Sequence, residues 1–188
     1  AALVSCGVMT GVGAVFNTAR VEPGAAVMVI GTGGVGLNVI QGAAIAGANP
    51  IVAVDVTDAK LELAKAFGAT HTINAAQEEN VVKAAKKLTG GGPDYCFECI
   101  GLGKTIEQAF RSLRKGGKAV VVGVTRGDDS VTVKPPALTF EEKTLTGSYF
   151  GSARPREDFP RLLALYRNKR LKLDELITRT YRIDEAPQ

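Results

Sequence analysis

A glycine-rich turn at residues 31–36, reading GTGGVG, is the part of the chain whose residue types and spacing most directly indicate chemistry. In a G-x-G-x-x-G series the first glycine permits a tight turn and the second lets an anion approach bare backbone. The third lets the following helix pack closely on the preceding strand. The free N–H groups and the positive dipole end of that helix then face the anion. Gly31, Gly33 and Gly36 hold these three positions, so the segment predicts a pyrophosphate-binding turn.

The elements that must position this turn surround it in the expected order. Residues 27–30 have strand character, residues 34–48 can form a largely apolar helix, and residues 51–54 form a second buried strand that ends at Asp55. An acid about 20 positions after the turn binds ribose hydroxyls in dinucleotide-binding proteins. The same carboxylate repels a 2′-phosphate, because like charges in one site cost several kcal/mol. No arginine directly follows Asp55, so the pattern favours NAD over NADP.

Strand and helix patterns alternate along the rest of the chain. This rhythm predicts an α/β fold of the Rossmann type: a doubly wound, mostly parallel six-stranded sheet of order 3-2-1-4-5-6, with helices on both faces. We expect one domain over residues 1–188, with Asp58 as the N-cap of its second helix. A further sheet-edge strand is expected at 131–134. The other expected strands are 71–74, 95–100, 118–122 and 143–150, and the other expected helices are 58–67, 78–88, 104–113 and 156–169.

Composition excludes several classes of protein. The chain has 45% hydrophobic and 22% charged residues, which are globular values, and no apolar run long enough for a membrane span. The net charge of +4 comes from scattered basic residues, which does not indicate nucleic-acid binding.

Three cysteines build no disulfide framework and favour a reducing, cytoplasmic location. Cys96 and Cys99 lie three apart on a strand and should face opposite sides of the sheet. The missing initiator Met indicates a piece of a longer protein.

A second segment carries a family resemblance. Residues 6–14, reading CGVMTGVGA, lead through VEPG at 21–24 into the glycine turn. With the intervals to Asp55 and to the VGV at 122–124, this order resembles the zinc-containing alcohol dehydrogenases of the medium-chain dehydrogenase/reductase superfamily. The resemblance covers nearly the whole chain, but only that family's cofactor-binding portion. It implies a parent enzyme that moves hydride between NAD and a small alcohol or aldehyde.

The resemblance also implies roles for individual residues. Cys6 resembles one protein ligand of the catalytic zinc, and Lys60 resembles a residue near the adenosine ribose. In the family the other zinc ligands and the proton-relaying groups lie upstream of this segment, and the four-cysteine zinc loop is missing here. No catalytic residue is therefore assigned, and the chain alone is expected to be inactive. The implied cofactor-binding residues are Thr10, Gly31, Gly33, Gly34, Val35, Gly36, Asp55, Lys60, Ile100, Val122, Gly123, Val124 and Phe150.

Three other functions fit parts of the pattern. A zinc-free quinone or enoyl reductase of the same superfamily would use NADPH, which Cys6 and Asp55 disfavour. An S-adenosylmethionine methyltransferase also has a glycine turn and an acid after its second strand, but the helix at 34–48 and the strands after residue 130 fit it poorly. The chain could also act only as an NAD-binding and dimerisation module. We expect a homodimer through residues 130–150, because unpaired sheet edges invite pairing. The sequence does not identify the alcohol.

Overall fold

The computed structural model describes residues 2–185, and within them lies a six-stranded sheet in the order β3-β2-β1-β4-β5-β6. All neighbouring strands are parallel, which confirms the expected fold class and strand order. The strand order reverses between β1 and β4, so ligands of such sheets bind at the carboxyl ends of these strands. The strands are β1 (Val27–Ile30), β2 (Ile51–Asp55), β3 (His71–Asn74), β4 (Tyr95–Glu98), β5 (Lys118–Val121) and β6 (Thr144–Gly147).

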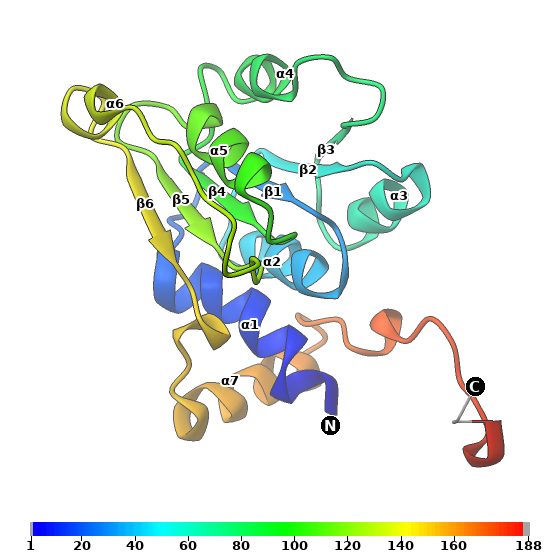
Figure 1. Cartoon of the computed structure of the whole chain (residues 1–188). Helices are drawn as coiled ribbons and strands as arrows, with labels where there is room; N and C mark the ends of the chain where they lie inside the picture. Colours follow the sequence, from blue (N-terminus) through cyan, green and yellow to red (C-terminus); the bar gives the residue numbers. More distant parts are fainter. Residues whose placement is uncertain (1, 186–188) are drawn as a thin grey trace.

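Helices cover both faces of the sheet, and a third layer lies beyond one of them (Figure 1). One face packs against α2 and α3, and the other against α4 and α5. The third layer joins α1 to α7 and rests on α2. The helices are α1 (Gly7–Gly13), α2 (Gly34–Ile45), α3 (Asp58–Ala66), α4 (Val81–Leu88), α5 (Gly103–Ser112), α6 (Pro135–Thr139) and α7 (Pro155–Arg167). Shorter helical segments are η1 (Ala2–Ser5), η2 (Ala14–Ala19), η3 (Phe150–Ser152), η4 (Asp174–Leu176) and η5 (Ile183–Glu185).

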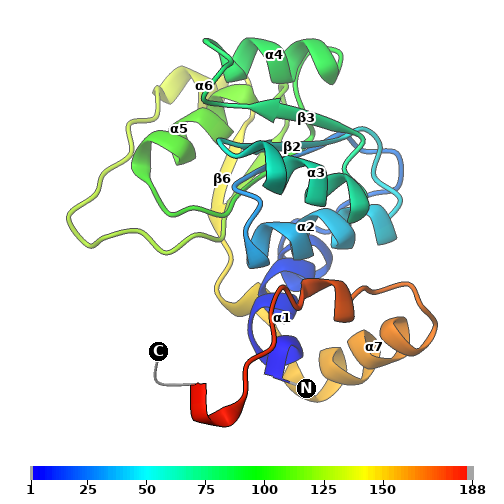
Figure 2. The same ribbon diagram turned by 90° about the vertical axis from the view of Figure 1, so that its right-hand side faces the viewer.

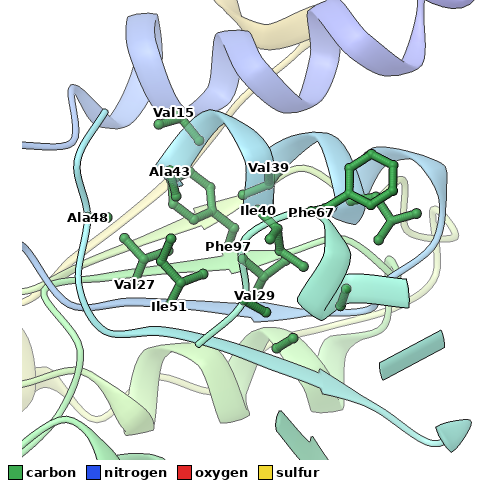
Figure 3. Packing of buried hydrophobic residues seen from close by; sticks show 14 of the residues in the cluster. Val15, Val27, Val29, Val39, Ile40, Ala43, Ala48, Ile51, Phe67 and Phe97 are labelled. Atoms are coloured by element: carbon green, nitrogen blue, oxygen red, sulfur yellow. The ribbon is translucent and has the colours of Figure 1, made fainter. Parts of the chain in front are cut away.

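The central strands are buried on both faces. All four residues of β1 are buried, as a continuous apolar run in a doubly covered parallel sheet should be. Figure 3 shows Val29 and Phe97 packed beneath Ile40 of α2. Cys96 belongs to the cluster on the opposite face, whereas Cys99 packs against the cluster of Figure 3. The expectation that these two thiols face opposite sides of the sheet is therefore confirmed.

A close backbone approach fixes α1 on α2. A Cβ added at Gly11 would stand 2.5 Å from Asn38 Cβ and 2.6 Å from the Val35 carbonyl oxygen, so only glycine fits there. Figure 2 shows α1 between α2 and α7. This crossing brings the residues just before Gly11 to the beginning of α2. None of the helices within residues 2–185 has the length and apolar character needed to cross a membrane.

The expected strand at 131–134 is wrong. These residues form irregular chain, and the Thr132 N–H donates to Glu107 Oε1 of α5 at 2.9 Å. The Thr132 N–H is therefore bonded to a side-chain oxygen and not to the carbonyl oxygen of a neighbouring strand. The following Pro135 and Pro136 open the short helix α6, where proline fits the first turn. On this side the sheet therefore ends with β6, and β3 forms its other edge. Strand β6 ends at Gly147 rather than at the expected residue 150, where the helical turn η3 begins.

Two helix starts also differ from expectation. Helix α4 begins at Val81 rather than near residue 78, because Asn80 Oδ1 accepts the Lys83 N–H at 2.9 Å and caps the helix there. Asp58 is the first residue of α3 rather than its N-cap, which is Thr57. The Asp58 carboxylate instead accepts a hydrogen bond from Asn74 Nδ2 at 2.6 Å.

Candidate functional site

The glycine turn has the tight geometry that its sequence predicts. Gly31 has φ +89°, a conformation that favours glycine, and a Cβ added at Gly36 would overlap the Gly31 carbonyl oxygen. Around Gly33 and Gly34 the space is open: among residues 2–185, no atom beyond the local backbone lies within 4 Å of a Cβ added at either glycine. The backbone is therefore tightly packed where β1 meets α2. It is accessible at Gly33 and Gly34, where a ligand would approach.

The N-terminus of α2 offers backbone donors to an anion at this opening. Gly33 stands at the N-cap in an extended conformation, and no side chain caps the helix. The first N–H groups of a helix have no partner within it, and the helix dipole adds positive potential there. A cleft of about 380 Å³ lies beside them, lined by Thr32, Gly33, Gly34 and Lys60 among others. One cation and several free N–H groups therefore face the same space, as a pyrophosphate site requires.

Asp55 stands beside the turn with its carboxylate already ordered. It is 8% exposed, and Thr32 donates to its Oδ2 from both the backbone N–H, at 2.9 Å, and the hydroxyl, at 3.0 Å. Its Oδ1 accepts the N–H groups of Val56, at 2.8 Å, and Thr57, at 3.2 Å. Burial by itself would raise the pKa of Asp55, but the Thr32 hydrogen bonds, the Lys60 charge and the Thr57 N–H together hold that pKa below its usual value. The group is therefore an anion at neutral pH.

The lowered pKa of Asp55 predicts an acid dependence of stability. A carboxyl group whose pKa is lower in the folded state stabilises the fold above its unfolded pKa of about 3.9, and this contribution is lost as pH falls through the folded pKa. The free energy of unfolding, measured by urea between pH 5 and pH 2, should fall more steeply in the wild type than in Asp55→Asn. Parallel curves for the two proteins would show that Asp55 contributes no such stabilisation.

Apolar side chains without cover follow the carboxyl ends of three strands. Val56 after β2 is 64% exposed, Ile100 and Leu102 after β4 are 46% and 52% exposed, and Val124 after β5 is 90% exposed. Exposed apolar groups gathered at a ligand-binding edge indicate a surface that a bound molecule covers. Ile100 and Val124 were both expected there. Val122, by contrast, is buried in the core cluster that packs against α2 and α3.

Backbone contacts join the ends of β4 and β5 at the same edge. A Cβ added at Gly123 would overlap the Gly101 nitrogen, and one at Gly101, where φ is +89°, would overlap the Val124 carbonyl oxygen. The Gly123 N–H also donates to the Glu98 carbonyl oxygen at 2.9 Å. Gly123 therefore contributes backbone to the surface where the cofactor is expected to bind, next to Ile100.

Two expected site residues far apart in the sequence, Thr10 and Phe150, lie in different parts of the structure. Gly7 and Val8 of α1 line the 380 Å³ cleft together with the glycine turn, and half-buried Thr10 follows them on the same helix. Phe150 packs against the cluster between α1 and α7. Val35 is half-buried in the first turn of α2 and packs against the main core. The structure thus brings residues near Thr10 to the glycine turn, while Phe150 contacts the third layer.

Cys6 precedes α1 and is exposed. Within residues 2–185, no three His, Cys, Asp or Glu side chains come together as metal ligands. A catalytic zinc site takes three protein ligands and an open position, so Cys6 with its present neighbours does not fit a complete site.

The three thiols should differ in reactivity. Cys6 is exposed, whereas burial, together with the nearby Glu98 carboxylate, raises the pKa of both Cys96 and Cys99. The thiolate is the reactive form, so we expect one fast thiol in the native chain and three after unfolding. Ellman's reagent, with a Cys6→Ser control that removes the fast phase, checks this. A fast phase that persists in Cys6→Ser would contradict it.

Several residues of the site have no counterpart among the expected ones. Thr32 donates to Asp55 as described, and a threonine between the first two glycines of the turn was the available signal. Glu175, Leu176 and Thr178 line the 380 Å³ cleft because the chain after α7 folds back beside α1. No local pattern predicts that return.

A larger hollow of about 830 Å³ lies between α1, η2 and α7, but the residues that line it do not include the glycine turn.

The parallel sheet, the glycine turn at its switch point and the acid after β2 define a dinucleotide-binding domain of the Rossmann class. The family model described as "Zinc-binding dehydrogenase" matches residues 34–168. The chain therefore belongs to the zinc-binding dehydrogenase family, which confirms the resemblance to zinc-containing alcohol dehydrogenases.

Individual relatives agree with this assignment. The chain is 40% identical over 189 residues to an S-(hydroxymethyl)glutathione dehydrogenase of Paracoccus denitrificans, covering 97% of this chain and 50% of that protein. Benzyl alcohol dehydrogenase from Acinetobacter calcoaceticus superposes with a TM-score of 0.92 at 35% identity, covering 96% and 49% of the two chains. A structure described as a zinc-binding dehydrogenase from Sinorhizobium meliloti 1021 bound to NADP has a TM-score of 0.88 at 28% identity, covering 98% and 53%. The chain thus spans about half the length of these relatives.

Proposed function

We propose that residues 1–188 form the NAD(H)-binding domain of a zinc-dependent alcohol dehydrogenase, which transfers hydride between a small alcohol or aldehyde and the nicotinamide. The observation that carries the proposal is the anionic Asp55 carboxylate beside the open, uncapped N-terminus of α2. In this arrangement the pyrophosphate takes the N–H groups of the turn and the adenosine ribose takes the carboxylate. The free cysteines favour a reducing compartment, and we propose a cytoplasmic location.

The residues of the chain fit a nicotinamide dinucleotide in three ways. Gly33 and Gly34 leave room for the pyrophosphate, Lys60 supplies a positive charge to the same cleft, and the apolar rim at Ile100 and Val124 suits an uncharged ring face. When bound, the nicotinamide supplies the hydride acceptor. The chain's own part is to bind the cofactor, to present one ring face and to keep water from the other. Substrate activation belongs to groups outside these residues.

Asp55 supports NAD rather than NADP. A 2′-phosphate would bring at least one negative charge against a buried carboxylate whose existing donors already stabilise its anionic form. The NADP-bound structure among the relatives makes NADPH the alternative to test. Calorimetric titration of the chain with NADH and NADPH separates the two. We expect NADH to bind at least 10-fold more tightly, which corresponds to about 1.4 kcal/mol. Preference for NADPH, or binding of neither, would overturn the proposal.

We propose that the chain forms a homodimer through residues 130–150. Strand β6 is an outer edge of the sheet, and apolar side chains lie exposed near it: Leu138 is 48%, Phe140 81% and Tyr149 93% exposed. An uncovered strand edge with apolar neighbours favours pairing with a second copy.

Sedimentation equilibrium tests the dimer. We expect Phe140→Glu to weaken self-association by about 10-fold or more, because a charge would replace an apolar contact at the interface. Leu163→Glu is the control, since Leu163 is 41% exposed on α7, away from the β6 edge. A wild-type chain that remains monomeric at high concentration would exclude this interface.

A further inference from the structure

Two amide side chains are buried in the otherwise apolar helix α2. Asn38 is 1% exposed and Gln41 is 3% exposed. Asn38 lies against Gly11 of α1, so this side of α2 faces the third layer. A buried amide costs free energy unless its donors and its acceptor are paired. The partners of these two side chains therefore indicate what the amides contribute.

Hydrogen bonds through Gln41 join the glycine turn to residues 171–178, which follow α7 and are called here the return segment. The Gln41 amide donates to Asn38 Oδ1 at 2.6 Å and to the Lys172 carbonyl oxygen at 3.1 Å. Its Oε1 accepts the Lys172 N–H at 2.9 Å. Asn38 Nδ2 in turn donates to the Gly34 carbonyl oxygen at 2.7 Å. Every polar atom of Gln41 is therefore paired, and the return segment is held on the helix whose N-terminus belongs to the proposed pyrophosphate site.

Further contacts fix the course of the return segment, which passes beside α1 (Figure 2). Leu171 and Leu173 are buried in the cluster between α1 and α7, and half-buried Leu176 packs against that cluster and against the main core. The Tyr166 hydroxyl donates to Asp174 Oδ2 at 2.9 Å, so the Asp174 carboxylate is bonded to α7. The residue after Asp174 is therefore held at a defined place.

That residue is Glu175, and it lies at the proposed cofactor cleft. Glu175 lines the 380 Å³ cleft together with the accessible backbone of Gly33 and Gly34, and Lys60 lines the same cleft from α3. Within residues 2–185 neither Lys60 nor Glu175 forms an ion pair. The charge of Glu175 is therefore not neutralised by a neighbouring cation. It repels an anion that enters the cleft, whereas Lys60 and the dipole of α2 attract it.

We propose that residues 174–178 form the outer wall of the dinucleotide cleft, and that Glu175 on this wall lowers the affinity for the anionic cofactor. Gln41 is the positioning residue, because it holds the wall on α2 and does not itself line the cleft. A lower affinity favours release of the cofactor, and product release limits the rate of many enzymes. This inference rests on the proposed function.

Titration with NADH and with ADP-ribose, which carries the adenosine and pyrophosphate groups of NADH, tests the charge of Glu175. Glu175→Gln should bind both ligands about threefold more tightly than the wild type at low salt, because one like charge leaves the cleft. The gain should disappear at about 1 M salt, where the Debye length is about 3 Å. Glu62→Gln is the matched control. It removes the same charge from an exposed acid of α3 that pairs with Lys65 and does not line the cleft, so its affinities should equal those of the wild type.

A double-mutant cycle tests the role of Gln41. Gln41→Ala leaves the Lys172 backbone without its partners, so the wall would no longer be held at the cleft. In that background Glu175→Gln should change the affinity for ADP-ribose by less than about 1.5-fold. A purely structural role of Gln41 would leave the threefold gain intact, and that result would overturn its role in positioning.

Glu175→Gln alone decides the proposal if Gln41→Ala does not fold. Equal affinities of the wild type and Glu175→Gln at low salt, or an equal gain in Glu62→Gln, would overturn the role of Glu175. Failure of the wild type to bind either ligand would instead overturn the proposed function.

Discussion

Gly36→Ala is expected to destabilise the chain by about 3 kcal/mol or more and to abolish NADH binding, because its new Cβ would overlap the Gly31 carbonyl oxygen. The obstacle is backbone rather than a flexible side chain, so strand β1 and helix α2 would have to move apart. That movement would displace the helix N-terminus on which the proposed pyrophosphate site depends. Thermal unfolding and an NADH titration of the same sample measure the two effects.

Two other glycines separate folding from binding. Gly33→Ala has open space around its Cβ and should fold with near wild-type stability, yet the methyl group would occupy the position where the pyrophosphate meets the backbone. We expect it to weaken NADH binding by about 10- to 100-fold, through loss of hydrogen bonds to a charged group. Gly127→Ala, also in open space but distant in sequence from the turn, should change neither property. Wild-type NADH affinity in Gly33→Ala would contradict a pyrophosphate at this turn.

Asp55→Asn is expected to weaken NADH binding by roughly 10- to 100-fold, because a charge-assisted hydrogen bond to the ribose contributes about 1.5–3 kcal/mol. The same substitution removes the charge that repels a 2′-phosphate, so NADPH binding should weaken less, or improve. The preference for NADH should therefore narrow. Calorimetry with both cofactors, on protein shown to be folded by circular dichroism, measures the change in preference.

Asp58→Asn is the matched control for this experiment. It removes the same charge three residues further on, but the Asp58 carboxylate bonds Asn74 at the surface and not the glycine turn. We expect its NADH affinity and its cofactor preference to remain those of the wild type. If Asp58→Asn and Asp55→Asn shift the preference equally, general electrostatics rather than a ribose contact would explain the selectivity.

The sheet could be predicted because its determinants are local. The runs at Val27–Ile30 and His71–Asn74 have strand character in the sequence, and the structure places β1 and β3 at the same bounds. The segment at 131–134 also has an extended pattern, but the Thr132 N–H bonds to the Glu107 side chain, which no local pattern reveals. The start of α4 was missed because Asn80 caps more effectively than the acidic residues before it.

The site residues could be predicted from the sequence at positions that only one residue type can fill. Gly31, Gly36 and Asp55 follow from backbone geometry and charge, and the structure places them together at one edge of the sheet. Other contacts depend on distances across strands and loops. These are the hydrogen bonds that order Asp55 and the three that Glu98 Oε1 accepts from Ile100, Gly101 and Thr105. Glu98 interrupts an otherwise apolar strand, and that isolated charge was the only sequence signal for it. The return of Glu175 and Leu176 to the cleft depends on tertiary packing beyond α7.

A crystal structure of the chain with NADH bound tests the central proposal most directly. We expect the pyrophosphate against the N–H groups at Gly33 and Gly34, the adenosine ribose hydroxyls on the Asp55 carboxylate, and the nicotinamide against Ile100. A dinucleotide in the 830 Å³ hollow between α1 and α7, or one whose ribose lies away from Asp55, would contradict the proposed site.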